Sequence, residues 1–497
     1  MDNTAVVVVV SYLVIVTLIG TLLARRNAGA GDWAVAGGGM GVMMIAVGVA
    51  GTRIGGAGTY GVAGDVMTDG VWNMWWYGIA SFLAMLVMAV LFVKPYRRLQ
   101  LHTVGEIFTR RFGDRRNQVL TSLCVQIEYF IVNVIEAYVI AVVLKGIVGM
   151  PMHWGVLVAA SVLVTYVALG GLWGAAFANL IHCVVIIAGL GAVAWMGVDQ
   201  LGGWAATREL VDAAILTQQL AHPDGLARAD RFWTLTGGSW IPVIAMIFSV
   251  VIHTPAASVY TNYASAARTE RTLVPAFLIA GLIAALMPVL AGIVGLLSLA
   301  HYGFESGVAG YANLTRVAAD VSPVVGALAI AAVLAAVISS GGPILLASAT
   351  MFVRDWLPGT SEWSTTRQLR AYRVTTVVYG LVAAGIAWLN AVVLKLSVLD
   401  MLLFGFAMVV PPAICVTFLL YWRRTTSTGV FVGMAAGLAA GLACFAWVKA
   451  TGSGLDPSYA TTLVPLVVVP LVSLLTDDSA GQQARADGFY GSLRAAD

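Results

Sequence analysis

Charged residues are scarce in this chain. Asp, Glu, Lys and Arg make up 10% of its 497 residues, whereas 60% are hydrophobic and the mean hydropathy is +0.90. A soluble protein carries about 25% charged residues, so this composition excludes a chain that faces water over most of its length. Stretches such as AVVVVVSYLVIV also lack the alternation of apolar and polar residues that an outer-membrane barrel needs. The sequence therefore predicts an all-α polytopic membrane protein.

Cysteines and catalytic signatures are also rare. The four cysteines, Cys124, Cys183, Cys415 and Cys444, lie in apolar segments without CxxC spacing, which favours buried side chains over disulfides or metal ligands. The sequence has no P-loop, no HExxH and no metal-spaced His/Cys cluster. A GxGxxG pattern at residues 56–61 lies inside an apolar run, whereas a dinucleotide site needs a preceding strand and a helix N-terminus facing water. We therefore expect no enzyme activity.

Long apolar runs recur along the whole chain, each long enough to cross about 30 Å of hydrocarbon as a helix. We expect about thirteen spans, at approximately 4–24, 40–64, 71–93, 118–148, 152–170, 173–198, 238–262, 273–300, 321–353, 370–390, 395–421, 428–448 and 459–475. A polar insert at about 199–237 separates the sixth and seventh, and a short polar tail, 476–497, follows the last. We expect a single transmembrane domain over 1–497.

The basic residues indicate how the chain crosses the membrane. If the N-terminus is outside, most of the 27 Lys and Arg fall on the cytoplasmic side, as the positive-inside rule requires. Arg25 and Arg26 follow the first apolar run rather than precede it, which is the reverse of a signal peptide. We expect a multi-pass protein of the plasma or inner membrane, with its C-terminus in the cytoplasm. The net charge of +3 reflects this orientation and indicates no nucleic-acid partner.

Two spans look interrupted at the bilayer centre. The second reads AVGVAGTRIGGAGTYGVAG, and the seventh, IFSVVIHTPAASVYTNY, contains Pro255 among polar neighbours. If the helix at 4–24 is accessory, these spans open two successive five-helix sets, about 40–198 and 238–421, followed by accessory helices at 428–475. Interrupted helices at matching positions are typical of inverted-repeat transporters with a site at the midplane.

Arg53 lies in the middle of the second span, where an arginine costs at least about 2.5–3.5 kcal/mol and must face a cavity or a partner. It either binds an anionic substrate or pairs with a neighbouring acid. In the fourth span, Tyr129, Asn133 and Glu136 follow i, i+4, i+7 spacing and share one stripe, with Glu128 on a neighbouring face. A glutamate beside Arg53 would be ionised, whereas one without a partner would be protonated and able to carry a proton.

Three further polar residues lie at or near predicted breaks. His253, just before Pro255, could bind substrate, relay a proton or simply be hydrogen-bonded. Ser339 and Ser340 lie in AAVISSGGPILLASATMFVRD of the ninth span. Serines in a membrane helix commonly bond to the preceding turn. Alternatively, this pair and the freed carbonyls of a broken helix form an oxygen cage for Na⁺.

Three motifs together resemble the sodium:solute symporter family over about residues 30–425: TVGEIFTRRFG, VALGGLWGAAFANLIH and the serine-pair stretch. The sequence GTRIGGAGTYG is most similar to the choline-transporter-like branch. The resemblance implies a LeuT-like fold, a 5+5 inverted repeat with one extra N-terminal helix, with Na⁺ as the coupling ion. The Na⁺ ligands that it implies are Gly51, Ile54, Ala336, Ser339 and Ser340.

Three positions depart from the family pattern. Relatives commonly have aspartate where this sequence has Asn179, and often glutamine where it has His182. These differences weaken the case for a second cation or proton site there. Arg53 stands where relatives have aspartate or an aromatic residue. A cation at this position repels choline-like substrates and favours an anion, unless Glu136 neutralises it. It could also replace a second Na⁺.

The sequence thus predicts a secondary active transporter that couples Na⁺ to a small polar solute carrying a carboxylate or another anionic group. The predicted substrate-binding residues are Thr52, Arg53, Trp75, Asn133, Glu136 and His253. The alternatives are a proton-coupled or uncoupled carrier, a sensor module and a membrane enzyme. For a sensor, the short tail 476–497 has no room for a kinase domain. The expected partners are the solute and the lipid bilayer, with no obligate protein partner.

Overall fold

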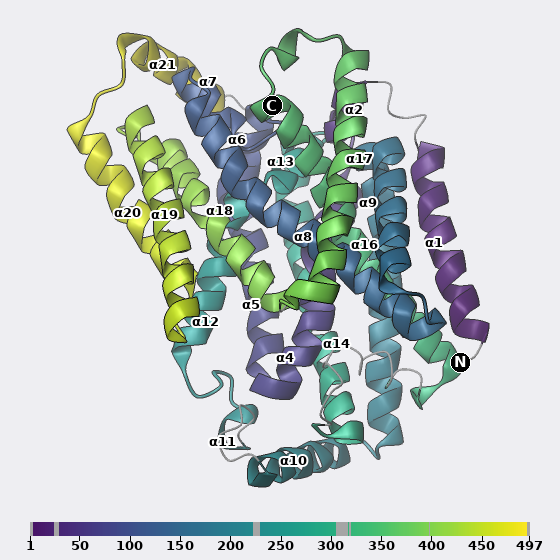
Figure 1. Cartoon of the computed structure of the whole chain (residues 1–497). Helices are drawn as coiled ribbons and strands as arrows, with labels where there is room; N and C mark the ends of the chain where they lie inside the picture. The colour runs from purple at the N-terminus through teal and green to yellow at the C-terminus, as the bar shows by residue number, and fades with distance from the viewer. Residues whose placement is uncertain are drawn as a thin grey trace.

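The apolar runs fold into helices throughout the computed structural model, which describes residues 3–23, 29–221, 229–304, 317, 320–396 and 398–494. Among these residues there is no strand, and a single isolated bridge pairs Met40 with Ala267. The long helices lie side by side, with α10 and α11 beyond one end of the bundle and α7 and α21 near the other (Figure 1). Arg25 and Arg26 lie outside the described residues.

The long helices are α1 (Asn3–Leu23), α3 (Val42–Gly56), α5 (Trp72–Val87), α8 (Arg116–Val148), α9 (Met152–Gln200), α14 (Leu273–Tyr302), α16 (Pro323–Met351), α17 (Thr365–Leu389), α18 (Val398–Tyr421), α19 (Ser427–Thr451) and α20 (Pro457–Leu475). The other helices used below are α2 (Ala30–Val35), α4 (Val62–Asp69), α6 (Val93–Arg98), α7 (Glu106–Phe112), α10 (Trp204–Ala221), α11 (Ala229–Phe232), α12 (Trp240–Ile247), α13 (Ser258–Ser265) and α21 (Ala480–Arg494).

Ten helices in the described part of the chain are long and apolar enough to cross a membrane, or eleven if the bent pair α12–α13 counts as one span. This number is below the predicted thirteen for two reasons. The apolar stretch of α1 is short, Val6–Ile19, and α9 contains two predicted spans. The 49 residues of α9 would extend about 73 Å as one helix, more than twice the hydrocarbon thickness. Its two parts meet at Gly171, whose φ of 56° and ψ of −154° are non-helical.

Both predicted interruptions are present. The first follows from Gly55, whose φ of 48° and ψ of 175° end the regular part of α3, and a π-helical turn, Ala57–Gly61, then leads into α4. Glycine adopts this backbone conformation without the strain that a Cβ would cause. The second lies just after Pro255, which lacks a backbone donor: the helical stretch Trp240–Ala256, which begins with α12, is bent by 48° relative to α13, with Ala257 extended between them.

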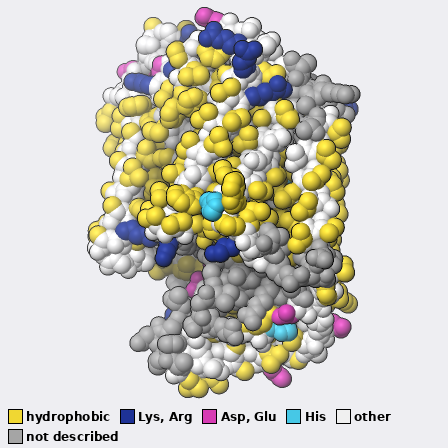
Figure 2. Space-filling model, turned by 45° about the vertical axis from the view of Figure 1, so that its right-hand side comes forward, with side chains coloured by type: hydrophobic (Ala, Val, Ile, Leu, Met, Phe, Trp, Pro, Cys, Tyr) yellow, Lys and Arg dark blue, Asp and Glu magenta, His cyan; other side chains and the backbone are white. Residues whose placement is uncertain are grey.

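Helix α16 forms the centre of the bundle, where it packs against α3, α8, α9 and α17. Every residue from Ala329 to Met351 in this helix is buried. Small residues allow the close approach of neighbouring helices: a Cβ at Gly189 of α9 would lie 2.8 Å from the Leu328 carbonyl of α16. The face shown in Figure 2 carries a broad band of hydrophobic side chains, with basic side chains at its margins.

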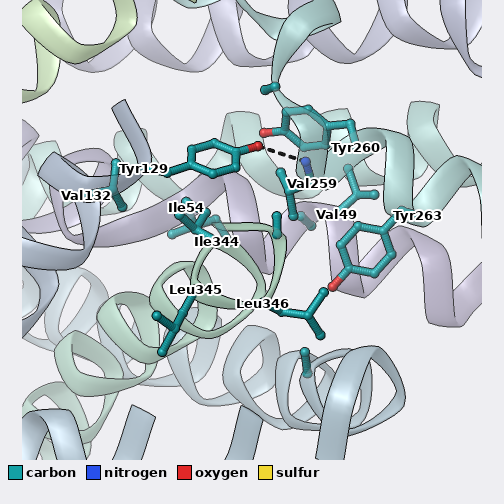
Figure 3. Packing of buried hydrophobic residues seen from close by; sticks show 14 of the residues in the cluster. Val49, Ile54, Tyr129, Val132, Val259, Tyr260, Tyr263, Ile344, Leu345 and Leu346 are labelled. Atoms are coloured by element: carbon teal, nitrogen blue, oxygen red, sulfur yellow. Dashed lines mark hydrogen bonds between the residues drawn. The ribbon is translucent and has the colours of Figure 1, made fainter. Parts of the chain in front are cut away.

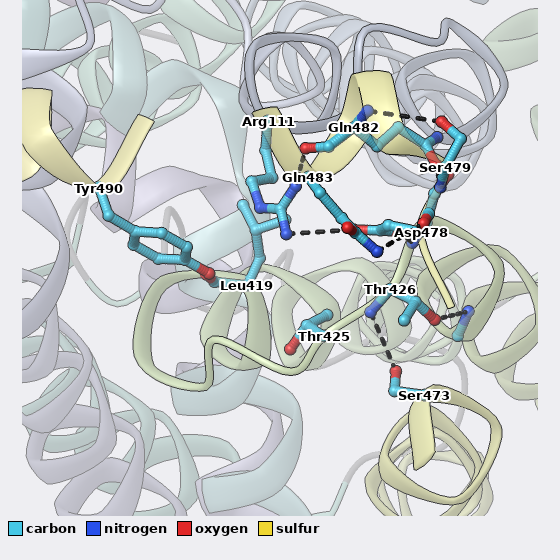
Figure 4. A network of polar contacts seen from close by, with 12 residues as sticks. Arg111, Leu419, Thr425, Thr426, Ser473, Asp478, Ser479, Gln482, Gln483 and Tyr490 are labelled. Atoms are coloured by element: carbon cyan, nitrogen blue, oxygen red, sulfur yellow. Dashed lines mark hydrogen bonds and ion pairs between the residues drawn. The ribbon is translucent and has the colours of Figure 1, made fainter. Parts of the chain in front are cut away.

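The C-terminal tail, which the sequence predicts only as a short polar segment, forms α21. It docks beside α7 through an ion pair between Arg111 Nη2 and Asp478 Oδ2, 3.1 Å apart (Figure 4). The Tyr490 hydroxyl donates to the Leu419 carbonyl of α18 at 2.9 Å. The tail is therefore part of the folded bundle.

Candidate functional site

The break in α3 brings backbone carbonyls next to the serine pair of α16. The Ser339 hydroxyl lies 2.8 Å from the Gly51 carbonyl oxygen and 2.7 Å from that of Ala336. All three residues are buried. A hydroxyl and two carbonyls offer oxygen donors to a desolvated Na⁺ without a carboxylate. The structure thus brings together three of the residues expected to bind Na⁺.

The other two expected Na⁺ ligands are placed differently. Ile54 lies on the wall of a neighbouring cavity. The Ser340 hydroxyl donates to Glu136 Oε1, which also accepts from the backbone N–H of Gly56 at 3.4 Å. The approach is close, because a Cβ at Gly56 would lie 3.1 Å from Glu136 Oε2. Glu136 therefore connects α8 to α16 and to the broken helix.

Arg53 faces the cavity beside the break. Its side chain is buried, with 7% of the residue exposed. Nη2 donates to the Val250 carbonyl at 2.7 Å, and Nε has no hydrogen-bond partner among the described residues. Within that same part of the chain, no ion pair joins Arg53 to Glu136 or to another carboxylate. Of the two interpretations of Arg53, the geometry favours a guanidinium directed at a ligand over one locked to an acid.

The cavity has a volume of about 50 Å³, and helices α3, α5, α8, α13, α16 and α18 contribute to its wall. Its aromatic wall consists of Tyr77, Tyr129, Tyr260 and Phe406. The Tyr129 hydroxyl accepts a hydrogen bond from the backbone N–H of Val259 at 2.8 Å, next to the Tyr260 ring (Figure 3). This contact connects α8 to the second broken helix.

Four of the predicted substrate residues, Thr52, Arg53, Glu136 and His253, line the cavity. The Thr52 hydroxyl donates to the Gly48 carbonyl within its own helix at 2.7 Å. The ring of His253 stacks on Phe406, with centroids 4.3 Å apart, while its Nδ1 contacts the Ser249 carbonyl. His253 thus lines the cavity with one ring face stacked on Phe406 and its Nδ1 already in contact with the backbone.

The other two predicted substrate residues, Trp75 and Asn133, do not reach the cavity. Trp75 is 41% exposed on α5, and Tyr77, about 200° further round the helix, lines the cavity instead. Asn133 donates to the Tyr129 carbonyl of its own helix at 2.7 Å. The polarity of Asn133 therefore did not indicate that it faces the cavity, because its amide is hydrogen-bonded within its own helix.

The stripe of α8 that forms the wall includes the predicted Tyr129 and Glu136, but it takes in Glu128 rather than Asn133. The cavity-lining residues of this helix are Glu128, Tyr129, Val132, Ile135 and Glu136. They follow i, i+1, i+4, i+7, i+8, the spacing of one helical face. The two glutamates eight residues apart were the available signal.

Asn179 and His182, the two departures on α9, hold neighbouring helices. Asn179 Nδ2 donates to the Gly48 carbonyl of α3 at 2.9 Å, and His182 Nδ1 contacts the Tyr12 hydroxyl of α1. These contacts give both side chains packing roles, in line with the weakened case for a second ion site.

A second cavity of about 270 Å³ lies toward the α10–α11 end of the bundle and shares Ala57 and Tyr77 with the first. Three carboxylates line it, Asp65, Asp69 and Asp456. We refer to this second cavity as the acidic vestibule. Because the two cavities share lining residues, the vestibule adjoins the cavity that Arg53 lines.

At the opposite end, the segment between α6 and α7 is hydrogen-bonded to α13. Asn262 Nδ2 donates to the His102 carbonyl at 2.8 Å, and the Ser265 hydroxyl donates to the Leu101 carbonyl at 2.6 Å. Arg354 forms an ion pair with Glu106. The burial of Glu106 acts to raise its pKa, but Arg354 and His102 outweigh this effect and lower it. Burial also lowers the pKa of His102, to about 4.

Comparisons with known proteins agree with this architecture. A sodium/proline symporter of Staphylococcus aureus is 22% identical over 95% of this chain and 92% of its own length. An uncharacterized symporter of Bacillus subtilis, YwcA, is 23% identical over 38% of this chain and 37% of its own length. The solved structure of a Na⁺-coupled sialic acid symporter covers 96% of this chain and 98% of its own, with a TM-score of 0.80 at 17% identity.

The structural likeness confirms the LeuT-like fold that the motifs implied. The model of the sodium:solute symporter family matches residues 33–437. Because this match spans most of the sequence, from the α2–α3 region into α19, the chain belongs to the sodium:solute symporter family.

Proposed function

We propose that the protein moves a small polar organic solute, with a carboxylate or other anionic group, across a cell membrane in symport with Na⁺. One observation carries the proposal. The Ser339 hydroxyl meets the Gly51 and Ala336 carbonyls only two residues along α3 from Arg53, whose guanidinium faces a cavity. An oxygen-donor group for a cation and a positive charge for an anion thus share one broken helix.

Na⁺ binds between α3 and α16 at Gly51, Ala336 and Ser339, with Ile54 and Ser340 as further ligands if the helices shift. The ion replaces the hydrogen bonds that the Ser339 hydroxyl now makes to the two carbonyls. It thereby holds α3 in the conformation that presents Arg53. The anionic group of the solute accepts a hydrogen bond from the unpaired Nε of Arg53, beside Thr52 and His253.

Transport proceeds by alternating access. The segment between α6 and α7 closes one end of the bundle, whereas the acidic vestibule approaches the cavity from the other. The two five-helix repeats, about 40–198 and 238–421, rock around the site, with the helices at 4–24 and 428–475 outside them. The N-terminus and the insert at 199–237 face outward, and the C-terminal tail faces the cytoplasm.

Uptake of radiolabelled solutes into proteoliposomes tests the proposal, after a thermal-shift screen of purified protein with carboxylates, neutral amides and quaternary amines. Ligands that bind the folded state raise its stability. We expect stabilisation by a carboxylate-bearing solute in NaCl but not in KCl, uptake driven by a Na⁺ gradient, and loss of both in Arg53→Gln. Uptake driven by a pH gradient without Na⁺ would overturn the proposal in favour of proton coupling. Binding of amines alone would overturn the assignment of Arg53.

A further inference from the structure

Glu128 is a buried carboxylate that the transport mechanism above does not use. It lines the same cavity as Arg53, and the residue is 4% exposed. Its Oε2 has no hydrogen-bond partner, and none of the ion pairs in the described part of the chain includes it. The charged form of a buried carboxyl group without a partner is costly, and a ligand with an ammonium group would supply the missing partner and stabilise that form.

The packing around Glu128 holds it at the cavity. A Cβ at Gly405 of α18 would lie 3.2 Å from the Cα and 3.6 Å from the Cγ of Glu128, so α18 presses directly on this side chain. Phe406, the next residue of α18, is part of the cavity wall. Glu136, the other glutamate of the cavity, accepts hydrogen bonds from Ser340 and Gly56 through Oε1, although its Oε2 also has no partner among the described residues. Glu128 has neither of these bonds, so it is the carboxylate more available to a ligand.

We propose that the solute is a compact zwitterion, whose anionic group binds Arg53 and whose ammonium group binds Glu128. This inference rests on the proposed function, because it concerns the same cavity. Arg53 on α3 and Glu128 on α8 face the cavity without forming an ion pair with each other. A solute with both charges gives each group a partner, whereas a solute with one charge leaves the other group buried and unpaired.

Two other features of the site favour a positive group in addition to the anionic one. Tyr129, Tyr260 and Phe406 line the cavity together with Glu128, and aromatic faces attract ammonium groups. A ligand that approaches from the acidic vestibule also passes Asp65, Asp69 and Asp456. This set of carboxylates repels a free anion, whereas a zwitterion has no net charge.

The size of the cavity limits the spacing of the two charges. About 50 Å³ accommodates a few water molecules, so the solute is small and its charged groups are separated by few bonds. An amino or imino acid fits this description.

Two trios of probes test the inference in a thermal-shift titration of the purified full-length protein. One trio is L-proline, cyclopentanecarboxylate and pyrrolidine, and the other is L-alanine, propionate and ethylamine. Each trio keeps a similar skeleton but removes the amine or the carboxylate. In NaCl, we expect at least one zwitterion to bind about 10–100-fold more tightly than both of its single-charge analogues, as expected for one charged hydrogen-bonded contact. Equal binding of a single-charge analogue, or binding of neither zwitterion, overturns the inference.

Variants identify the carboxylate responsible. In Glu128→Gln, we expect the affinity for the zwitterion to fall to that for the carboxylate analogue, because the amide lacks the negative charge that binds the ammonium group. Gln126→Leu is the matched control on the same helix, because Gln126 lies outside the cavity lining and donates to the Ser348 carbonyl at 2.9 Å; it should keep the preference, whatever its unliganded stability. An unchanged preference in Glu128→Gln overturns the role of Glu128. If that variant does not fold, the ratio measured in the wild type still decides the substrate class.

The choice of salt separates this inference from the proposed function. A carboxylate that binds as tightly as its zwitterion, but only in NaCl, overturns the zwitterion and leaves Na⁺-coupled anion transport standing. A zwitterion that binds equally in NaCl and KCl supports the pairing of charges and overturns the coupling to Na⁺.

Discussion

Replacement of Ser339 by alanine tests the ion site most directly. In the structure, its hydroxyl is next to the carbonyls of Gly51 and Ala336, at 2.8 and 2.7 Å. Alanine removes one oxygen donor from this group and leaves both backbone carbonyls in place. We therefore expect Ser339→Ala to lose its response to Na⁺ while it still folds.

The expected sizes of the two effects differ. Without Na⁺, the variant loses about one hydrogen bond, worth about 1 kcal/mol of unfolding free energy. With Na⁺ at about 100 times its dissociation constant, the wild type gains about 2.7 kcal/mol from ion binding. The variant loses this gain as well, so its deficit should be about 1 kcal/mol in KCl and about 4 kcal/mol in NaCl.

The assay is thermal unfolding of purified protein across a series of NaCl concentrations, with KCl replacing NaCl at constant ionic strength. Ser348→Ala is the matched control, because Ser348 lies in the same helix and its buried hydroxyl donates to the Ile344 carbonyl of that helix at 2.8 Å. We expect Ser348→Ala to be destabilised similarly in both salts and to keep the full Na⁺ response. An undiminished Na⁺ response in Ser339→Ala, or an equal loss in Ser348→Ala, would refute the reasoning.

Three other predictions concern contacts around the site and at the closed end. Ser340→Ala and Glu136→Gln should each lower the unfolding free energy by about 1–3 kcal/mol, and the double variant by less than the sum, which a double-mutant cycle measures. Because the folded-state pKa of His102, about 4, lies below its ordinary value of 6.5, the folded state takes up fewer protons than the unfolded state. Stability should therefore fall by about 2 kcal/mol from pH 6.5 to pH 5 through this group, and His102→Gln should remove that part of the pH profile. Asp478→Asn breaks the ion pair with Arg111 and should speed amide hydrogen exchange in α21; unchanged exchange would contradict this role.

Features set by local backbone chemistry could be predicted from the sequence. Gly55 ends the regular helix through a positive φ, and Pro255 interrupts its helix because it has no backbone N–H to donate. Arg53 could be assigned to a cavity because the cost of its charge in a membrane leaves few alternatives. These properties belong to single residues and do not depend on how the helices rotate.

Features set by helix rotation could not be predicted in the same way. Ser339 and Ser340 are adjacent in the chain and about 100° apart around α16, and they face α3 and Glu136 respectively. Trp75 and Tyr77 belong to an aromatic run in which only Asn73, one helical turn before Tyr77, marks the inner face. The sequence of the tail did not predict α21, because the tail docks through contacts with α7 and α18, which are distant from it in the sequence.

The spacing along α3 suggests how ion and solute are coupled. Gly51 offers its carbonyl to Ser339, Arg53 lines the proposed solute cavity, and Gly56 donates its N–H to Glu136. These three contacts occur within six residues of one backbone, on either side of the break at Gly55. An ion that fixes the Gly51 carbonyl thus restricts the backbone that carries Arg53, and a solute on Arg53 restricts the carbonyl in return. Because such coupling is reciprocal, the solute should tighten Na⁺ binding by the same factor by which Na⁺ tightens solute binding.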